Sequence, residues 1–167
     1  VYTTDSPDGR ESAFGANILI RCRHDFSPTS CAELKLYYDY TTRKTFLFET
    51  PRSTVDLDFQ HNVQLGSRQS LLWGVGSRVS YNQYASNNPV FVILEDTLTT
   101  RLYSGFIEDE IRLVPDRVTL TPGCKIEHND MTGWELQPGL RFTYQPSASR
   151  HLWAAVSRAV RTPSESE

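Results

Sequence analysis

The chain has 167 residues, of which 38% are hydrophobic and 22% charged, and its formal net charge is -3 at pH 7. This length fits one domain, and the composition argues against a disordered or fibrous chain. The small negative charge and the scattered basic residues argue against a nucleic-acid partner, which requires clustered lysine and arginine. The longest clear apolar run, Val90 to Leu94, is much shorter than the roughly 18 residues that a transmembrane helix requires.

Turn signals divide the chain into about eight segments in which apolar and polar residues alternate. In chain order these segments cover residues 13–24, 33–48, 55–65, 73–82, 98–113, 118–126, 134–144 and 151–163. Short connections lie at one end, at 27–30, 66–69, 115–116 and 147–150. The connections at the other end are 50–53, the long 85–97 and 130–133. The pattern predicts an all-β fold, an antiparallel up-and-down meander of about eight long strands.

The segment from Trp134 to Tyr144 has the clearest period of two. Many segments span about eleven to fifteen residues, whereas strands of globular proteins usually have about five or six. Ten residues at about 3.3 Å each, tilted by about 40°, cover about 25 Å, the height of the apolar band of an outer-membrane barrel. Trp134 and Tyr144 then stand at its two aromatic rims. We expect part of a transmembrane β-barrel, with a self-closed small barrel or a sandwich as the alternative.

The chain contains three cysteines, Cys22, Cys31 and Cys124, which form neither a CxxC pair nor a disulfide framework. Cys22 and Cys31 flank the turn HDFSPTS, so a hairpin in an oxidising compartment would allow them to pair if their Cβ geometry suits. The alternative is that both are small apolar strand residues. The sequence leaves both interpretations open.

No signature of an enzyme is present. Neither an HExxH motif nor a paired-cysteine spacing accompanies the histidines, which lie far apart on different predicted strands: His24, His61, His128 and His151. The pair Asp56 and Asp58 lacks the glycine-containing loop of a calcium site. The glycines Gly74 and Gly76 precede no helix and so do not form a nucleotide loop. We therefore predict no enzymatic activity, no metal and no cofactor.

The run YSGFIEDEIRLVPDRVTLTPGCKIEHNDMTGWELQPGLRFTYQPSASRHLWAAVSRAVRTPS resembles the barrel of TonB-dependent outer-membrane receptors. It contains, in the order of that family, an FxxDEIRL strand, a Pro-Asp turn, a G-x-E-x-x-P-x-L-R strand and WAAxSRAxRTP. The matching positions are Phe106, Asp109, Glu110, Arg112, Gly123, Glu127, Gly133, Pro138, Arg141, Trp153, Ser157, Arg158, Arg161 and Pro163. The upstream segments LLWGVGSRVS and LYYDYTTR resemble earlier strands of the same barrel more loosely.

The resemblance implies a place in the bacterial outer membrane and the import of a scarce nutrient such as a ferric siderophore, haem or cobalamin. Energy would come from the inner membrane through the TonB complex. Full receptors have about 22 strands and a plug, whereas this chain holds about eight strands and nothing like a plug. We expect residues 1–167 to be a single internal segment of a receptor barrel, in contact with outer-membrane lipid and with the plug and remaining barrel of the parent chain. The alternative function is a self-contained small β-barrel that binds a ligand or serves as a scaffold.

Charged side chains on the polar strand faces would line the inside of such a barrel and form ion pairs across neighbouring strands. The resemblance implies that they also contact the plug. The predicted lumen or plug-contacting residues are Asp56, Asp58, Arg78, Lys125, Glu127, Glu135, Arg141 and Arg161. The resemblance also implies that extracellular loops capture the substrate, and 85–97 is the one substantial loop. We therefore expect a siderophore-like small ligand to contact Tyr84, Asn87, Asn88, Phe91 and Asp96.

The closing stretch LWAAVSRAVRTPSESE fits two periods. Leu152, Val156 and Val160 recur as on an amphipathic helix, whereas Leu152, Ala154 and Val156 alternate as on a strand. Because the stretch follows a turn and matches a strand of the receptor family, we predict a strand. Arg158 and Arg161 then fall on opposite faces, so we expect a bulge or a change of register near them.

Overall fold

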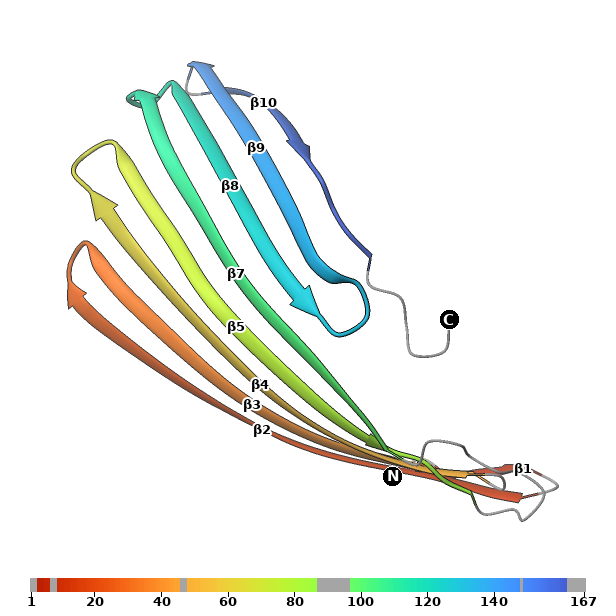
Figure 1. Ribbon diagram of the computed structural model, residues 1–167. Coiled ribbons are helices and arrows are strands. Elements are labelled where there is room, and N and C mark those ends of the chain that lie inside the picture. The colour runs from red at the N-terminus through yellow and green to blue at the C-terminus, as the bar shows by residue number, and fades with distance from the viewer. Residues whose placement is uncertain (1–2, 7–8, 46–47, 87–96, 148, 162–167) are drawn as a thin grey trace. The chain divides into compact units, whose positions relative to one another are not determined.

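The computed structural model describes residues 3–6, 9–45, 48–86, 97–147 and 149–161, which form a ten-stranded sheet (Figure 1). In chain order the strands are β1 (Thr3–Ser6), β2 (Gly9–Ser27), β3 (Ser30–Lys44), β4 (Phe48–Leu65), β5 (Gln69–Gln83), β6 (Ala85–Ser86), β7 (Thr97–Val114), β8 (Val118–Asn129), β9 (Gly133–Ser147) and β10 (Arg150–Ser157). Their order in the sheet is β1-β2-β3-β4-β5-β7-β8-β9-β10, and β6 pairs with β4. The predicted meander of eight long strands is confirmed, and β1 and β6 are two short additions to it.

The chain divides into two compact units. The first consists of residues 1–20, 35–57 and 78–101, and the second of residues 21–34, 58–77 and 102–167. Strands β8, β9 and β10 lie wholly in the second unit, whereas β2, β3, β4, β5 and β7 contribute residues to both. No helix within the described ranges is long and apolar enough to cross a membrane.

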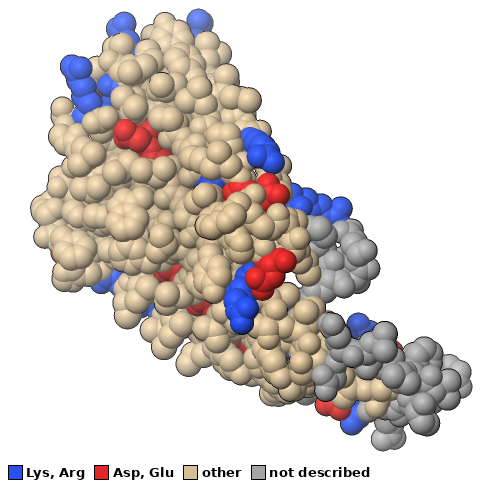
Figure 2. Space-filling view, in the orientation of Figure 1, with Lys and Arg blue, Asp and Glu red and all other residues tan. Residues whose placement is uncertain are grey.

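The apolar face of the sheet is its exposed face. In β9, Trp134 is 70% exposed and Leu136 51% exposed, whereas the alternating Glu135 and Gln137 are half-buried. Among the described residues Ala32 is the one buried hydrophobic side chain, and most of the surface seen in Figure 2 carries no charge. A sandwich or a soluble closed barrel requires a packed apolar core, so the alternative fold is not supported. Apolar residues outside and polar residues inside are the arrangement of a transmembrane β-barrel.

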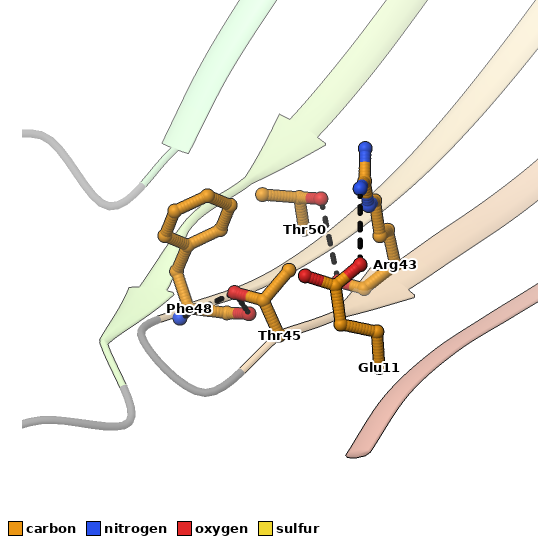
Figure 3. A network of polar contacts seen from close by, with 5 residues as sticks. All are labelled: Glu11, Arg43, Thr45, Phe48 and Thr50. Carbon is orange, nitrogen blue, oxygen red and sulfur yellow. Dashed lines mark hydrogen bonds and ion pairs between the residues drawn. The ribbon is translucent and has the colours of Figure 1, made fainter. Parts of the chain in front are cut away.

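One predicted turn is wrong. Residues 50–53 belong to β4, and the chain reverses before that strand, between Thr45 and Phe48. There the Thr45 N–H donates to the Phe48 carbonyl oxygen at 2.8 Å, and Thr45 Oγ1 accepts from the Phe48 N–H at 3.2 Å (Figure 3). Pro51 led to the incorrect position, because proline is typical of turns but is also compatible with a strand wherever the ladder does not need its N–H.

The turn predicted at 130–133 is confirmed, and a buried side chain closes it. Asn129, at the end of β8, is 5% exposed, and its Oδ1 accepts the N–H groups of Met131 at 2.9 Å and Thr132 at 2.7 Å. Gly133 then enters β9 with a φ of 74°, a conformation that glycine adopts without a steric penalty. Two turn N–H groups thus have a partner that the ladder itself does not supply.

The prediction of a strand for the closing stretch is confirmed for β10. Its outward residues Leu152, Ala154 and Val156 pair with Tyr144, Phe142 and Leu140 of β9. The expected irregularity, however, lies at the beginning of β10, between Arg150 and Leu152. Because the strand ends at Ser157, Arg158 and Arg161 follow it, and the alternation of β10 does not assign them to a face.

Cys22 and Cys31 do not form a disulfide: these two and Cys124 are all free. Cys31 lines a hollow on the polar face together with Arg23 and Asp25. By alternation along β2, Cys22 lies on the face opposite to Arg23 and Asp25. The hairpin therefore places the two thiols on opposite sides of the sheet, where they cannot meet.

Candidate functional site: the polar face of the sheet

In the first unit the polar face is held together by an ion pair between neighbouring strands. The Arg78 Nε atom of β5 lies 2.6 Å from Asp56 Oδ2 of β4. The Asp56 side chain is mostly buried, whereas the Arg78 side chain is 55% exposed. The predicted pairing across strands is thus present, and the arginine remains accessible from the polar side.

Beside this ion pair lies a hydroxyl cluster that the sequence reasoning missed. Ser80 of β5 is 2% exposed, and its Oγ accepts a hydrogen bond from Arg52 Nη2 at 3.4 Å and lies 3.1 Å from Thr54 Oγ1. The period of two places Ser80 on the face of Arg78 and Arg52 on the face of Asp56. That periodicity was the available signal, although it did not indicate that a serine would be the most buried side chain of the group.

In the second unit two carboxylates face each other across β8 and β9. Glu127 is the direct partner of Glu135 in the register, and like charges opposite each other are unfavourable. Each therefore has its own cation. Lys125 Nζ lies 2.6 Å from Glu127 Oε2, and Arg158 Nη2 lies 3.3 Å from Glu135 Oε2. The Lys125 pair runs along one strand, not across two, because its neighbours across the ladder, Phe106 and Gln137, carry no charge.

Arg158 pairs with Glu135 and also contacts the main chain of β9. The Arg158 main-chain N–H donates to the Pro138 carbonyl oxygen at 3.0 Å, and its Nη1 donates to the Leu136 carbonyl oxygen at 2.9 Å. Arg158 therefore continues the contact with β9 after the ladder of β10 has ended. Arg161 lies three residues further on, in the part of the chain that follows the strand.

The polar faces of β7 to β10 border an open hollow of about 400 Å³. Its floor is a row of small residues, because Gly123 pairs with Gly139 and Gly139 with Ser157. Lys125 and Arg141 flank this row on β8 and β9. The predicted lumen residue Arg141 therefore lies at the edge of the hollow and is exposed. Its partners on the two neighbouring strands, Thr121 and Ala155, are uncharged.

An aromatic side chain on the polar face covers a glycine. A Cβ atom at Gly74 of β5 would lie 2.6 Å from Phe106 Cε1 and 2.5 Å from the Phe59 carbonyl oxygen. Only glycine fits this place without a shift of the chain. Phe106 is part of the family-like motif, but its contact with Gly74 depends on strand pairing that the motif does not specify.

Of the other predicted positions, Asp58 lies on β4 two residues beyond Asp56. Tyr84, predicted to contact substrate, directly follows β5 and is half-buried. The remaining predicted ligand contacts lie outside the described residues: Asn87, Asn88, Phe91 and Asp96.

The Ser30 and His61 side chains resemble a catalytic pair, since Ser30 Oγ and His61 Nε2 are 2.9 Å apart. Trp73 Nε1, however, donates to His61 Nδ1 at 3.1 Å. An indole N–H is only a donor, so Nδ1 must accept and the proton of the neutral ring is on Nε2. This tautomer cannot take the serine proton as a general base, and the contact is structural. Within the described ranges no group of three His, Cys, Asp or Glu residues could hold a metal ion.

Comparison with known proteins agrees with this geometry. The family model described as TonB dependent receptor-like, beta-barrel, matches residues 2–167. The ferric enterobactin receptor of Pseudomonas aeruginosa is 34% identical over 65 residues, which are 39% of this chain and 9% of the relative.

Solved structures have the same fold. The siderophore receptor PirA of Pseudomonas aeruginosa matches 94% of this chain with a TM-score of 0.75 and 16% identity. The ferric enterobactin receptor PfeA of the same organism, as a G324V mutant, matches 92% with a TM-score of 0.76 and 17% identity. The chain covers 29% and 26% of these two structures, so it spans less than a third of their length.

The relatives are outer-membrane transport receptors of Gram-negative bacteria and not enzymes, in agreement with the predicted localisation. A match along nearly the entire chain, together with an exposed apolar face and a charged, paired polar face, leads to one conclusion. The chain belongs to the family of TonB-dependent receptor β-barrels.

Proposed function

We propose that the protein containing this chain imports a ferric siderophore across the outer membrane of a Gram-negative bacterium. The family match over residues 2–167 is the observation that carries this proposal. A ferric siderophore takes precedence over haem or cobalamin because the curated relative is a ferric enterobactin receptor. The energy is expected to come from the TonB complex, and no chemical step is required of the barrel wall.

Within that function, the polar face is the wall of the lumen and meets the plug of the parent chain. The observations that support this role are the exposed cations of its ion pairs, such as Arg78, and the hollow flanked by Lys125 and Arg141. A cation that pairs with one carboxylate and remains exposed to water can form further hydrogen bonds with a second polar surface. The segment 84–96 is expected to contribute ligand contacts.

Growth under iron limitation tests the proposal. A Gram-negative strain without its own siderophore receptors is complemented with the complete gene and supplied with ferric enterobactin, other ferric siderophores, haem or cobalamin in separate cultures. Growth with at least one ferric siderophore is expected, and it should vanish in a strain that lacks the TonB complex. Rescue by haem or cobalamin alone, absence of any rescue, or rescue without the TonB complex would each overturn it.

A further inference from the structure

Three of the short turns at one end of the sheet carry an arginine at the same place. Arg68 directly precedes β5, Arg117 directly precedes β8, and Arg150 opens β10. All three belong to the second unit and all are exposed. We call them the arginine rim. Figure 1 draws the β7–β8 and β9–β10 turns at the top of the view, and Figure 2 shows Lys and Arg side chains along that edge.

The arginine rim is not neutralised by the chain itself. None of its three guanidinium groups forms an ion pair in the part of the chain that the structure describes, whereas nearby Arg112 lies 3.3 Å from Glu110. One acidic residue, Asp116, lies in these turns, and it forms no ion pair with Arg117. Within these three turns, three cations and one carboxylate leave a net positive charge.

The main chain of the rim is nevertheless fixed. The Arg68 carbonyl oxygen accepts the Arg112 N–H at 2.8 Å, and the Arg117 carbonyl oxygen accepts the Gln145 N–H at 2.7 Å. The Arg117 N–H in turn donates to Val114 at 3.1 Å. The backbone thus holds the positions of the side chains, while the guanidinium groups keep all their N–H donors for another partner.

Outward aromatic residues define the level of the rim relative to a membrane. Tyr144 pairs with Val118, the residue after Arg117, and with Leu152 of β10, close to Arg150. On β5, Trp73 lies five residues after Arg68 and hydrogen-bonds to His61. Tyrosine and tryptophan mark the boundary between hydrocarbon and headgroups, so the rim is at headgroup level. Short turns of outer-membrane barrels face the periplasm.

We propose that the arginine rim binds the phosphate groups of anionic phospholipids in the periplasmic leaflet of the outer membrane. Guanidinium groups bind phosphate oxygens in a bidentate way, and flexible arginine side chains reach along the surface to them. The proposal rests on the membrane location of the family and not on the nature of the imported ligand. Failure of siderophore import would therefore leave it standing, and its own failure would leave import unaffected.

Lipid preference of the intact receptor tests the proposal. The receptor is placed in nanodiscs of phosphatidylethanolamine and phosphatidylglycerol at low ionic strength, and the relative association of spin-labelled phosphatidylglycerol is measured. The wild type should prefer phosphatidylglycerol, and the triple variant Arg68→Gln, Arg117→Gln, Arg150→Gln should lose this preference. Each basic residue near a membrane surface contributes about fivefold, so a total reduction well above tenfold is expected. Replacement of all three by lysine keeps the charge and should retain most of the preference.

Arg43→Gln is the matched control, because Arg43 is an exposed arginine that already pairs with Glu11 at 3.2 Å (Figure 3). This variant should leave the preference unchanged. Heat-modifiable electrophoresis reports whether each variant is folded. The proposal is overturned if the triple glutamine variant keeps the preference, if Arg43→Gln lowers it equally, or if millimolar inorganic phosphate abolishes it, which would indicate a site for the free anion.

Discussion

Replacing Gly74 by alanine introduces a methyl group where the sheet has no room. The new Cβ atom would lie 2.6 Å from Phe106 Cε1 and 2.5 Å from the Phe59 carbonyl oxygen. The ring can rotate away, but the oxygen belongs to the main chain of β4, so one of the two strands must move. Overpacking of this kind costs about 1–3 kcal/mol, and we expect about 3 kcal/mol because backbone is one of the two contacts.

Urea unfolding of the intact receptor in lipid vesicles, followed by electrophoretic mobility and tryptophan fluorescence, measures this loss. Gly139→Ala is the matched control, since its Cβ would meet Ser157 Cβ at 3.6 Å, an ordinary contact. The double variant Gly74→Ala, Phe106→Ala removes the clash with the ring but not the clash with the Phe59 carbonyl oxygen. It should therefore recover only part of the stability that Gly74→Ala loses. If Gly74→Ala and Gly139→Ala unfold at the same urea concentration, the close approach between β4 and β5 is not as described and the reasoning fails.

Three further substitutions address polar contacts; the same urea assay measures the effect of the first two, and amide exchange that of the third. Asn129→Ala leaves two N–H groups of the β8–β9 turn without their acceptor and should cost about 1–3 kcal/mol; an unchanged midpoint would contradict this. Lys125→Met leaves Glu127 opposite Glu135 without its cation, so repulsion between the two carboxylates should lower the urea midpoint. A midpoint equal to that of the wild type would exclude such repulsion. Arg158→Lys keeps the positive charge but loses the two guanidinium N–H groups that bond Leu136 and Glu135 of β9. Amide hydrogen exchange at the end of β10 should therefore accelerate; unaltered exchange would refute this role.

The sequence predicted the parts of the fold that depend on local pattern. Alternation from Trp134 to Tyr144 is a property of one strand, so it identified both the strand and its exposed face. The turn after Asn129 was recognisable because its residues are typical of turns. The reversal at 45–48 was missed because it depends on the hydroxyl of Thr45. Threonine occurs both in turns and in strands, so it does not indicate a turn.

The candidate site was less accessible to sequence reasoning, because it depends on which residues face each other. Alternation placed Glu127 and Glu135 on the polar face but did not reveal that they are direct neighbours. That register explains why Glu127 uses a lysine on its own strand. Likewise Arg158 and Arg161 were assigned to faces of a strand that ends at Ser157, so their partners could not follow from the period. The contact of Gly74 with Phe106 requires two strands about thirty residues apart to pair, which no local signal encodes.

The near absence of buried apolar side chains, with Ala32 alone among the described residues, has a thermodynamic consequence. In a receptor barrel of the outer membrane, exposed apolar side chains such as Trp134 and Leu136 are expected to gain from contact with lipid the free energy that a soluble protein gains by burying its side chains. Folding is then coupled to insertion into the bilayer, and the free energy of unfolding depends on the lipid as well as on the chain. A change of bilayer thickness or of lipid headgroup should therefore alter the free energy of unfolding, as a core mutation does in a soluble protein.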